Sequence, residues 1–236
     1  MRWFFAFVLI AGCAAPHPRS PRRAVYIHDL AALLDDAKAA RKIVALVDTR
    51  VLTDLIPYGL GKVDRAALAR WIADLHHRGA RVIAPIAGSD RVRALAELGL
   101  DHFDGFVTEV EYWHAVDRAA AFADLLALIA QLRAAGARRV GVYLGDPTAE
   151  EAAQIARVVD FVFLNYNVRD PALAAQHERF AWFARAGTPI WPILYLEGEA
   201  HMHAYVAAHG IAATESAFHA PAPVAGFVYF TAEYWP

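Results

Sequence analysis

From Arg23 onward, short runs of β-branched and aromatic residues alternate with longer alanine-rich stretches in which apolar residues recur every three or four positions. Runs of the first kind are typical of strands, and stretches of the second kind are typical of amphipathic helices. The pattern predicts eight strands, over residues 24–28, 43–48, 81–87, 103–111, 139–144, 161–165, 189–196 and 226–231. Several are apolar almost throughout, as expected for parallel strands with both faces covered.

The stretches between these strands carry helix start and stop signals. They predict helices over residues 64–77, 117–135, 148–158 and 171–185. Asp64, Asp117 and Thr148 are suitable N-cap residues, and glycines follow several of the predicted ends.

This alternation predicts a parallel sheet with helices packed on it. Eight strands and seven intervening helical segments in roughly 215 residues fit an α/β fold, a compact (β/α)8 TIM barrel. We expect one such domain over residues 24–236, with the eighth helix absent or vestigial. A doubly wound sheet is the alternative, but Tyr26-Ile27-His28-Asp29 leads into a helix without a glycine-rich phosphate loop.

The first 23 residues have a different character. Arg2 precedes an apolar run over residues 3–12 that has the form of a secretory signal and is shorter than the roughly 20 residues that span a bilayer. The run ends Ile10-Ala11-Gly12-Cys13, which resembles the lipobox of bacterial lipoproteins. This resemblance implies a signal peptide over 1–12, a lipidated Cys13 with a tether to residue 23, and a lipid-anchored protein of the bacterial cell envelope. The alternative is an ordinary cleaved signal.

Charge and cysteine content exclude several classes of protein. The formal net charge is -2 and no basic run is dense, so we expect no nucleic-acid partner. Cys13 is the only cysteine, which excludes an intrachain disulfide. We expect no cofactor.

Acidic, amide and aromatic residues follow the predicted strands, where a TIM barrel places its chemistry. Aromatic rings stack on pyranose faces, and carboxylates bind hydroxyls or protonate a glycosidic oxygen. We therefore expect a glycan site. The candidates are Asp48, Glu109, Glu111, Trp113, Asn165, Tyr166, Asn167, Tyr195, Glu197 and Glu233.

Residues 103–111 contain the most informative pair. In an extended strand, Val107, Glu109 and Glu111 share one face, and the two carboxylates lie about 7 Å apart. Two acids at the end of a buried strand repel each other and lose hydration, which favours a functional reason for the pair. The alternative is that the strand ends at Thr108 and both acids lie in a solvated loop.

Residues 104–111, DGFVTEVE, are similar to the DGxDxDxE signature of glycoside hydrolase family 18, the chitinase-like TIM barrels. The resemblance implies that Glu111 is the general acid and that Glu109 replaces the neighbouring aspartate. Val107 stands where the family has another acid. Looser resemblances place Tyr166 at a family tyrosine, Asn167 at an aspartate and Phe230 at the tryptophan that floors the subsite.

In that family the substrate's own N-acetyl oxygen attacks the anomeric carbon, an exception to the two-carboxylate scheme. The resemblance implies that Glu109 and Tyr166 stabilise the reacting acetamido group or the developing cation. A variant pairs Glu111 with Glu197, where a separation of about 5–5.5 Å predicts retention and about 6.5–9.5 Å predicts inversion.

Two other functions remain open. Val107, Asn167 and Phe230 each replace a family residue, which favours an inactive carbohydrate-binding or interaction protein on the same barrel. Residues 197–203, EGEAHMH, offer oxygen and nitrogen ligands for a metal-dependent hydrolase. However, no third histidine has convincing spacing, so we expect no metal.

The lipoprotein hypothesis predicts a covalent label. Cells that express the full chain with radioactive palmitate should label the wild type, and the label should be lost in Cys13→Ser. A labelled Cys13→Ser variant, or an unlabelled wild type, would contradict the lipidation of Cys13.

Overall fold

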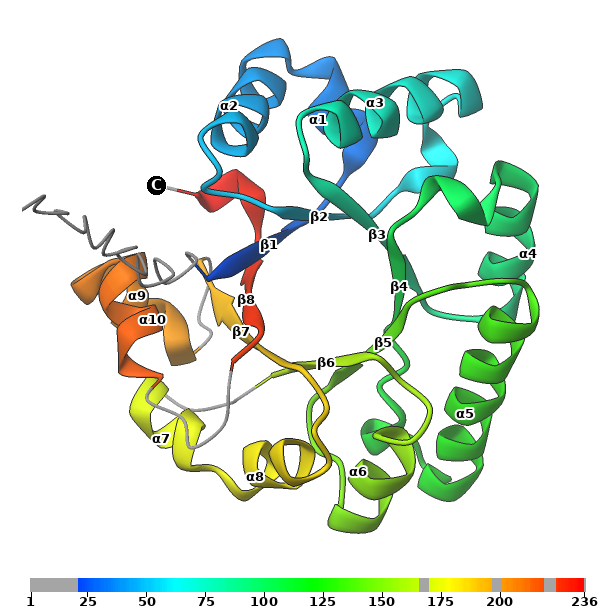
Figure 1. Cartoon of the computed structure of the whole chain (residues 1–236), viewed down its shortest axis with the longest axis vertical. Helices are drawn as coiled ribbons and strands as arrows, with labels where there is room; N and C mark the ends of the chain where they lie inside the picture. Colours follow the sequence, from blue (N-terminus) through cyan, green and yellow to red (C-terminus); the bar gives the residue numbers. More distant parts are fainter. Residues whose placement is uncertain (1–20, 166–169, 197–200, 219–223, 236) are drawn as a thin grey trace, which may run out of the picture.

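The computed structural model describes residues 21–165, 170–196, 201–218 and 224–235. Eight parallel strands close into a barrel in sequence order, with helices around the outside (Figure 1). The strands are β1 (Arg22–Ile27), β2 (Asp54–Pro57), β3 (Arg81–Ile86), β4 (Gly105–Thr108), β5 (Val140–Leu144), β6 (Phe161–Leu164), β7 (Ile190–Tyr195) and β8 (Gly226–Phe230). The predicted TIM barrel is confirmed.

The helices follow the strands as expected for βα units. They are α1 (Leu30–Asp35), α2 (Ala37–Asp48), α3 (Arg65–His77), α4 (Ser89–Leu98), α5 (Arg118–Ala134), α6 (Ala149–Ile155), α7 (Pro171–Gln176), α8 (Glu178–Arg185), α9 (His201–His209) and α10 (Ile211–Ala217). Short 3-10 turns are η1 (Leu60–Lys62), η2 (Leu100–His102), η3 (Tyr112–His114) and η4 (Ala232–Tyr234). Among the described residues, only η4 follows β8.

The predicted caps are in place. Asp64 and Asp117 each accept a hydrogen bond from a backbone N–H of the first helical turn, and Thr148 forms a capping box with Glu151. The single helix predicted over residues 171–185 is divided into α7 and α8, because His177 caps α8.

The predicted strand over residues 43–48 is wrong. These residues form the second half of α2, where Ile43 and Val47 are buried one helical turn apart. The true second strand, β2, has only four residues and contains Asp54 and Pro57, two residue types that are depleted in strands.

The position of Asp48 changes as a result. It is the last residue of α2, and its carboxylate pairs with Arg78 Nη1 at 2.9 Å, just after α3. Helices of βα units run back toward the amino ends of the strands, so Asp48 lies at the end of the barrel opposite the expected site. Its prediction as a substrate-binding residue is therefore wrong.

Alternate strand residues fill the barrel interior. This inner cluster comprises Ala24, Tyr26, Ile56, Ile83, Val107, Phe161, Phe163, Trp191, Ile193 and Val228. Residues on the opposite strand faces pack against the helices in a second cluster. Val107 is fully buried in the inner cluster, so an acid at this position would be desolvated among apolar side chains.

A charged cluster closes the amino end of the barrel. The Asp54 side chain is fully buried, and it accepts hydrogen bonds from Arg22 Nη2 at 2.8 Å, Arg81 Nε at 2.7 Å and Thr53 Oγ1 at 2.7 Å. Burial raises the pKa of Asp54, and Arg22 and Thr53 oppose that rise. The carboxylate therefore compensates the charge of two arginines that lie on neighbouring strands.

Within the described residues, no helix combines the length and the apolar character needed to cross a membrane.

Asp54 should be a large contributor to stability. Removing one partner from a buried ion pair leaves an uncompensated charge and typically costs about 3–5 kcal/mol. Because Arg22 and Arg81 are both partly exposed, Asp54→Ala should lower the free energy of unfolding by about 3 kcal/mol in urea titrations. The matched control, Asp48→Ala, removes a half-exposed ion pair and should leave the urea midpoint unchanged. Equal effects of the two variants would contradict this interpretation.

Candidate functional site

Glu109 lies on the floor of a cavity at the carboxyl ends of the strands. β4 ends at Thr108, but the Glu109 N–H still donates to the Ile86 carbonyl at 2.8 Å and continues the ladder. Tyr26 Oη donates to Glu109 Oε1 at 2.7 Å, and Tyr58 Oη donates to Oε2 at 2.6 Å. The carboxylate is thus held from both sides, directly above the inner cluster.

The environment of Tyr26 and Tyr58 keeps their hydroxyls as hydrogen-bond donors to Glu109. Their rings stack with centroids 5.4 Å apart, and Tyr26 is almost completely buried. Burial, followed by the negative charge of Glu109, raises the pKa of both hydroxyls. Both hydroxyls therefore stay protonated and remain donors to the Glu109 carboxyl group.

Glu111 reaches the same cavity by a different route. The predicted extension of the strand to residue 111 is wrong, because the chain leaves the extended conformation at Glu111 and turns into η3. Glu111 is exposed, yet it lines the cavity of about 290 Å³ that also contains Glu109. The two acids meet at one cavity although they do not share a strand face.

Two cavities adjoin at Glu111. The first, the central cavity of about 290 Å³, is lined by Tyr26, Tyr58, Glu109, Glu111, Tyr143, Ile193, Tyr195 and Phe230. The second, the side cavity of about 370 Å³, is lined by Glu111, Trp113, His114, Tyr143, Gly145, Asp146, Asn165 and Arg179. Glu111 and Tyr143 line both, so these two side chains stand at the boundary between them.

Aromatic rings form the walls of both cavities. Phe230 contacts Tyr26 and Tyr195, with ring centroids 5.4 and 5.7 Å apart. Trp113 contacts Tyr143 at 5.6 Å and lies over Gly145, where an added Cβ would come within 2.7 Å of the indole ring. Gly145 is therefore needed for Trp113 to occupy this position.

The turn that carries Glu111 and Trp113 is anchored from below. Tyr112 is buried, and its hydroxyl donates to Glu151 Oε2 at 3.2 Å. Arg118 Nη2 donates to the same oxygen at 2.6 Å, and its Nε donates to Oε1 at 2.9 Å. Glu151 thus connects η3 to the first turns of α5 and α6.

The structure brings most of the described candidates together. Glu109, Glu111, Trp113, Asn165, Tyr195 and Phe230 line the central or the side cavity. Glu233 accepts a hydrogen bond from the His28 N–H at 3.1 Å and lines a separate cavity of about 450 Å³ at the ends of β1 and β8. The predicted residues Cys13, Tyr166, Asn167 and Glu197 lie outside the described residues.

Sequence reasoning missed several lining residues. Tyr26 and Tyr143 occupy inward positions near strand ends, which is the available signal for them, but the sequence predicts candidates mainly among residues that follow the strands. Arg179 belongs to α8, is mostly buried, and lies 3.7 Å from Asp146 at the rim of the side cavity. The sequence predicts only a helix around Arg179, and this gives no indication that its side chain lines a cavity.

The residues of the proposed metal-dependent hydrolase are not assembled into a site in the described part of the chain. There, no three histidine, cysteine, aspartate or glutamate side chains lie close enough to hold a metal ion. Glu197 and Glu199 fall outside the described residues.

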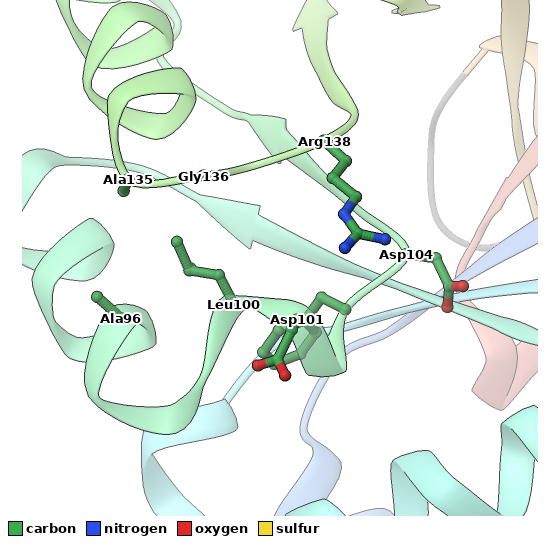
Figure 2. A pocket seen from close by; sticks show the side chains of 8 residues that line it. Ala96, Leu100, Asp101, Asp104, Ala135, Gly136 and Arg138 are labelled. Carbon is green, nitrogen blue, oxygen red and sulfur yellow. The ribbon is translucent and has the colours of Figure 1, made fainter.

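A further cavity, of about 510 Å³, lies at the opposite end of the barrel, between η2 and the end of α5. Figure 2 shows its charged side chains, of which Asp101 and Asp104 come from the segment around η2 and Arg138 from the segment after α5. Asp104 Oδ2 accepts a hydrogen bond from the Val82 N–H at 2.8 Å and lies 2.8 Å from His76 Nε2. Phe103 is the aromatic residue in its lining, whereas several aromatic rings line the central cavity.

Comparison with known proteins supports the fold. No protein-family model and no curated protein matches the chain. Several solved structures match the chain. One is a GH128 (subgroup I) endo-β-1,3-glucanase from Amycolatopsis mediterranei, a mutant in complex with laminaripentaose. It is 16% identical, with a TM-score of 0.56, over 89% of this chain and 88% of that chain.

Two enzymes that catalyse other reactions match the chain with similar TM-scores. The YdjI aldolase from Escherichia coli K12 is 10% identical, with a TM-score of 0.55, over 90% of this chain and 75% of that chain. Dihydrodipicolinate synthase from Bacillus clausii is 14% identical, with a TM-score of 0.52, over 88% of this chain and 67% of that chain. At these identities the similarity shows the TIM-barrel fold alone, and membership of family 18 stays a prediction.

The anchor of η3 should be sensitive to acid. Burial of Glu151 disfavours its charge, but hydrogen bonds from Arg118 and Thr148 outweigh burial and lower the pKa of Glu151 below its ordinary 4.5. A lowered pKa in the folded state gives stability that is present above the unfolded-state pKa and is lost as the pH falls through the folded-state pKa.

Glu151→Gln should therefore lower the free energy of unfolding by about 1–2 kcal/mol at pH 6, and the difference should shrink below pH 4.5. Urea titrations at pH 6, 4 and 3 test this, with the exposed neighbour variant Glu150→Gln as the control. A difference between wild type and Glu151→Gln that stays constant with pH would contradict the role of the charge.

Proposed function

We propose that this protein is a glycoside hydrolase-like enzyme that cleaves a polysaccharide at the carboxyl ends of its barrel strands, with Glu111 as general acid. One observation carries the proposal. A carboxylate fixed by two tyrosine hydroxyls, Glu109, and an accessible carboxyl, Glu111, line one cavity walled by aromatic rings. This is the set of groups that glycoside hydrolysis needs.

Glu111 is suited to donate a proton. A general acid must come within hydrogen-bond reach of the glycosidic oxygen, and Glu111 stands between two adjoining cavities. Sugars on the two sides of the scissile bond would occupy the central and the side cavity, which brings the bond itself to Glu111. A site divided in this way suits a chain of sugars better than a single one.

Glu109 is suited to stabilise positive charge. Hydrolysis passes through a transition state with cationic character at the anomeric carbon, and a fixed carboxylate stabilises such charge without having to reorganise. Tyr26 and Tyr58 keep both Glu109 oxygens in place. The same carboxylate would orient an acetamido group if the sugar is N-acetylated, as the family 18 resemblance implies.

The comparisons suggest which glycans to test first. The matching glucanase is an endo-β-1,3-glucanase bound to laminaripentaose, so laminarin is one natural substrate to try. Chitin oligosaccharides are the second class, because of the DGFVTEVE motif. We also propose that the protein is held at the bacterial cell envelope by a lipid on Cys13, a proposal that the lipobox-like sequence supports.

A non-catalytic carbohydrate-binding protein is the second candidate. Val107 favours it, because this residue is fully buried in the inner cluster at the position where the family 18 resemblance has an acid. Such a protein would use the same aromatic walls to hold a glycan without cleaving it.

The enzyme hypothesis predicts that Glu111→Gln lowers kcat by about 10²- to 10⁴-fold, because positioned general acids typically contribute that factor. The measurement is release of reducing sugar from laminarin and chitin oligosaccharides by the full chain. Glu97→Gln, an exposed acid on α4, is the matched control and should keep wild-type activity. Glycan binding without turnover, equal in wild type and Glu111→Gln, would instead support the binding protein.

A further inference from the structure

We propose that the Tyr143 hydroxyl is a substrate-binding hydrogen-bond donor, which Asn165 and Tyr195 orient toward the sugar at the scissile bond. The proposal rests on the proposed function of the same site. It adds a residue from β5 that no motif in the sequence indicates.

The position of Tyr143 is the first argument. Its side chain packs with the inner cluster and lines both cavities, as Glu111 also does. Contact with the Trp113 ring at 5.6 Å restricts the Tyr143 ring. A hydroxyl at the boundary between the cavities can reach an oxygen of the sugar whose bond Glu111 is proposed to protonate.

The hydrogen bonds of Tyr143 are the second argument. A phenolic oxygen offers two lone pairs and one proton. Asn165 Nδ2 donates to the Tyr143 oxygen at 2.8 Å, and Tyr195, which lines the central cavity with Tyr143, interacts with the same hydroxyl. Because Asn165 is the donor in this bond, the proton of the Tyr143 hydroxyl is left for another acceptor, and both cavities that Tyr143 lines can hold one.

Electrostatics keep this proton on the oxygen. Burial raises the pKa of Tyr143, the negative charges of Glu111 and Glu109 raise it further, and the hydrogen bonds from Asn165 and Tyr195 offset only part of the rise. Tyr143 therefore acts as a neutral donor and not as the acid. Glu111 keeps the role of proton donor to the leaving oxygen.

The direct test is Tyr143→Phe, which removes the hydroxyl and keeps the ring against Trp113. We expect kcat/KM to fall roughly 10- to 100-fold on a glycan that the wild type cleaves, as for the loss of one donor to a charged or charge-developing group. The urea midpoint should stay within error of wild type. Tyr205→Phe on α9 is the matched control and should keep wild-type kcat/KM.

A second variant separates orientation from simple packing. In Asn165→Asp the ionised carboxylate cannot donate, so the Tyr143 proton should turn toward it and away from the sugar. When that carboxylate is protonated at low pH, it can donate again. Activity relative to wild type should therefore recover as the pH falls, whereas a purely structural defect would give a deficit independent of pH.

Failure of this inference can be told from failure of the proposed function. Wild-type turnover that Glu111→Gln abolishes and Tyr143→Phe leaves within twofold would overturn the role of Tyr143 alone. If the wild type cleaves no glycan, a neutron structure of the full chain decides the inference independently. A Tyr143 deuterium that points into the cavities supports it, and one directed at Asn165 or Tyr195 overturns it.

Discussion

Closing eight short parallel strands into a barrel forces every second side chain into an interior without room for water. The inner cluster meets this requirement with aliphatic and aromatic residues, including Val107, Phe163 and Trp191. Polar groups are then admitted only at the two ends of the barrel, where each needs partners. The placement of Glu109 at one end and Asp54 at the other follows from this constraint.

The two ends satisfy their buried carboxylates differently. Arginines surround Asp54, and these ion pairs tie neighbouring strands together. Glu109 is surrounded by neutral hydroxyls from Tyr26 and Tyr58. The tyrosines at Glu109 are neutral donors that also line the central cavity, whereas the arginine partners of Asp54 are charged residues at the first positions of β1 and β3. We therefore propose the reaction at the Glu109 end and expect the larger contribution to stability from the Asp54 end.

The site is also coupled to the surrounding helices. Glu111 is the N-cap residue of η3 and Trp113 lies within it. Tyr112 of the same turn is fixed by the Glu151–Arg118 pair between α5 and α6. A network of Asn165 and Tyr143 continues from β6 to β5. These ion pairs and hydrogen bonds thus position Glu111 and Tyr143 at the boundary between the two cavities, where we propose that the glycosidic bond lies.

The sequence by itself determined the barrel, most strand positions and the helix caps, and it indicated Glu109 and Glu111, which the structure places at one cavity. Local periodicity and capping chemistry are encoded in neighbouring residues, and the motif at residues 104–111 is contiguous. Only the tertiary structure showed that Asp48 lies at the opposite end of the barrel and that residues 54–57 form β2. A strand of four residues has too few positions to show an apolar pattern as clear as that of the preceding amphipathic helix. Likewise, the contacts of Tyr26, Tyr58 and Tyr143 join residues far apart in the chain, and barrel closure alone brings them together.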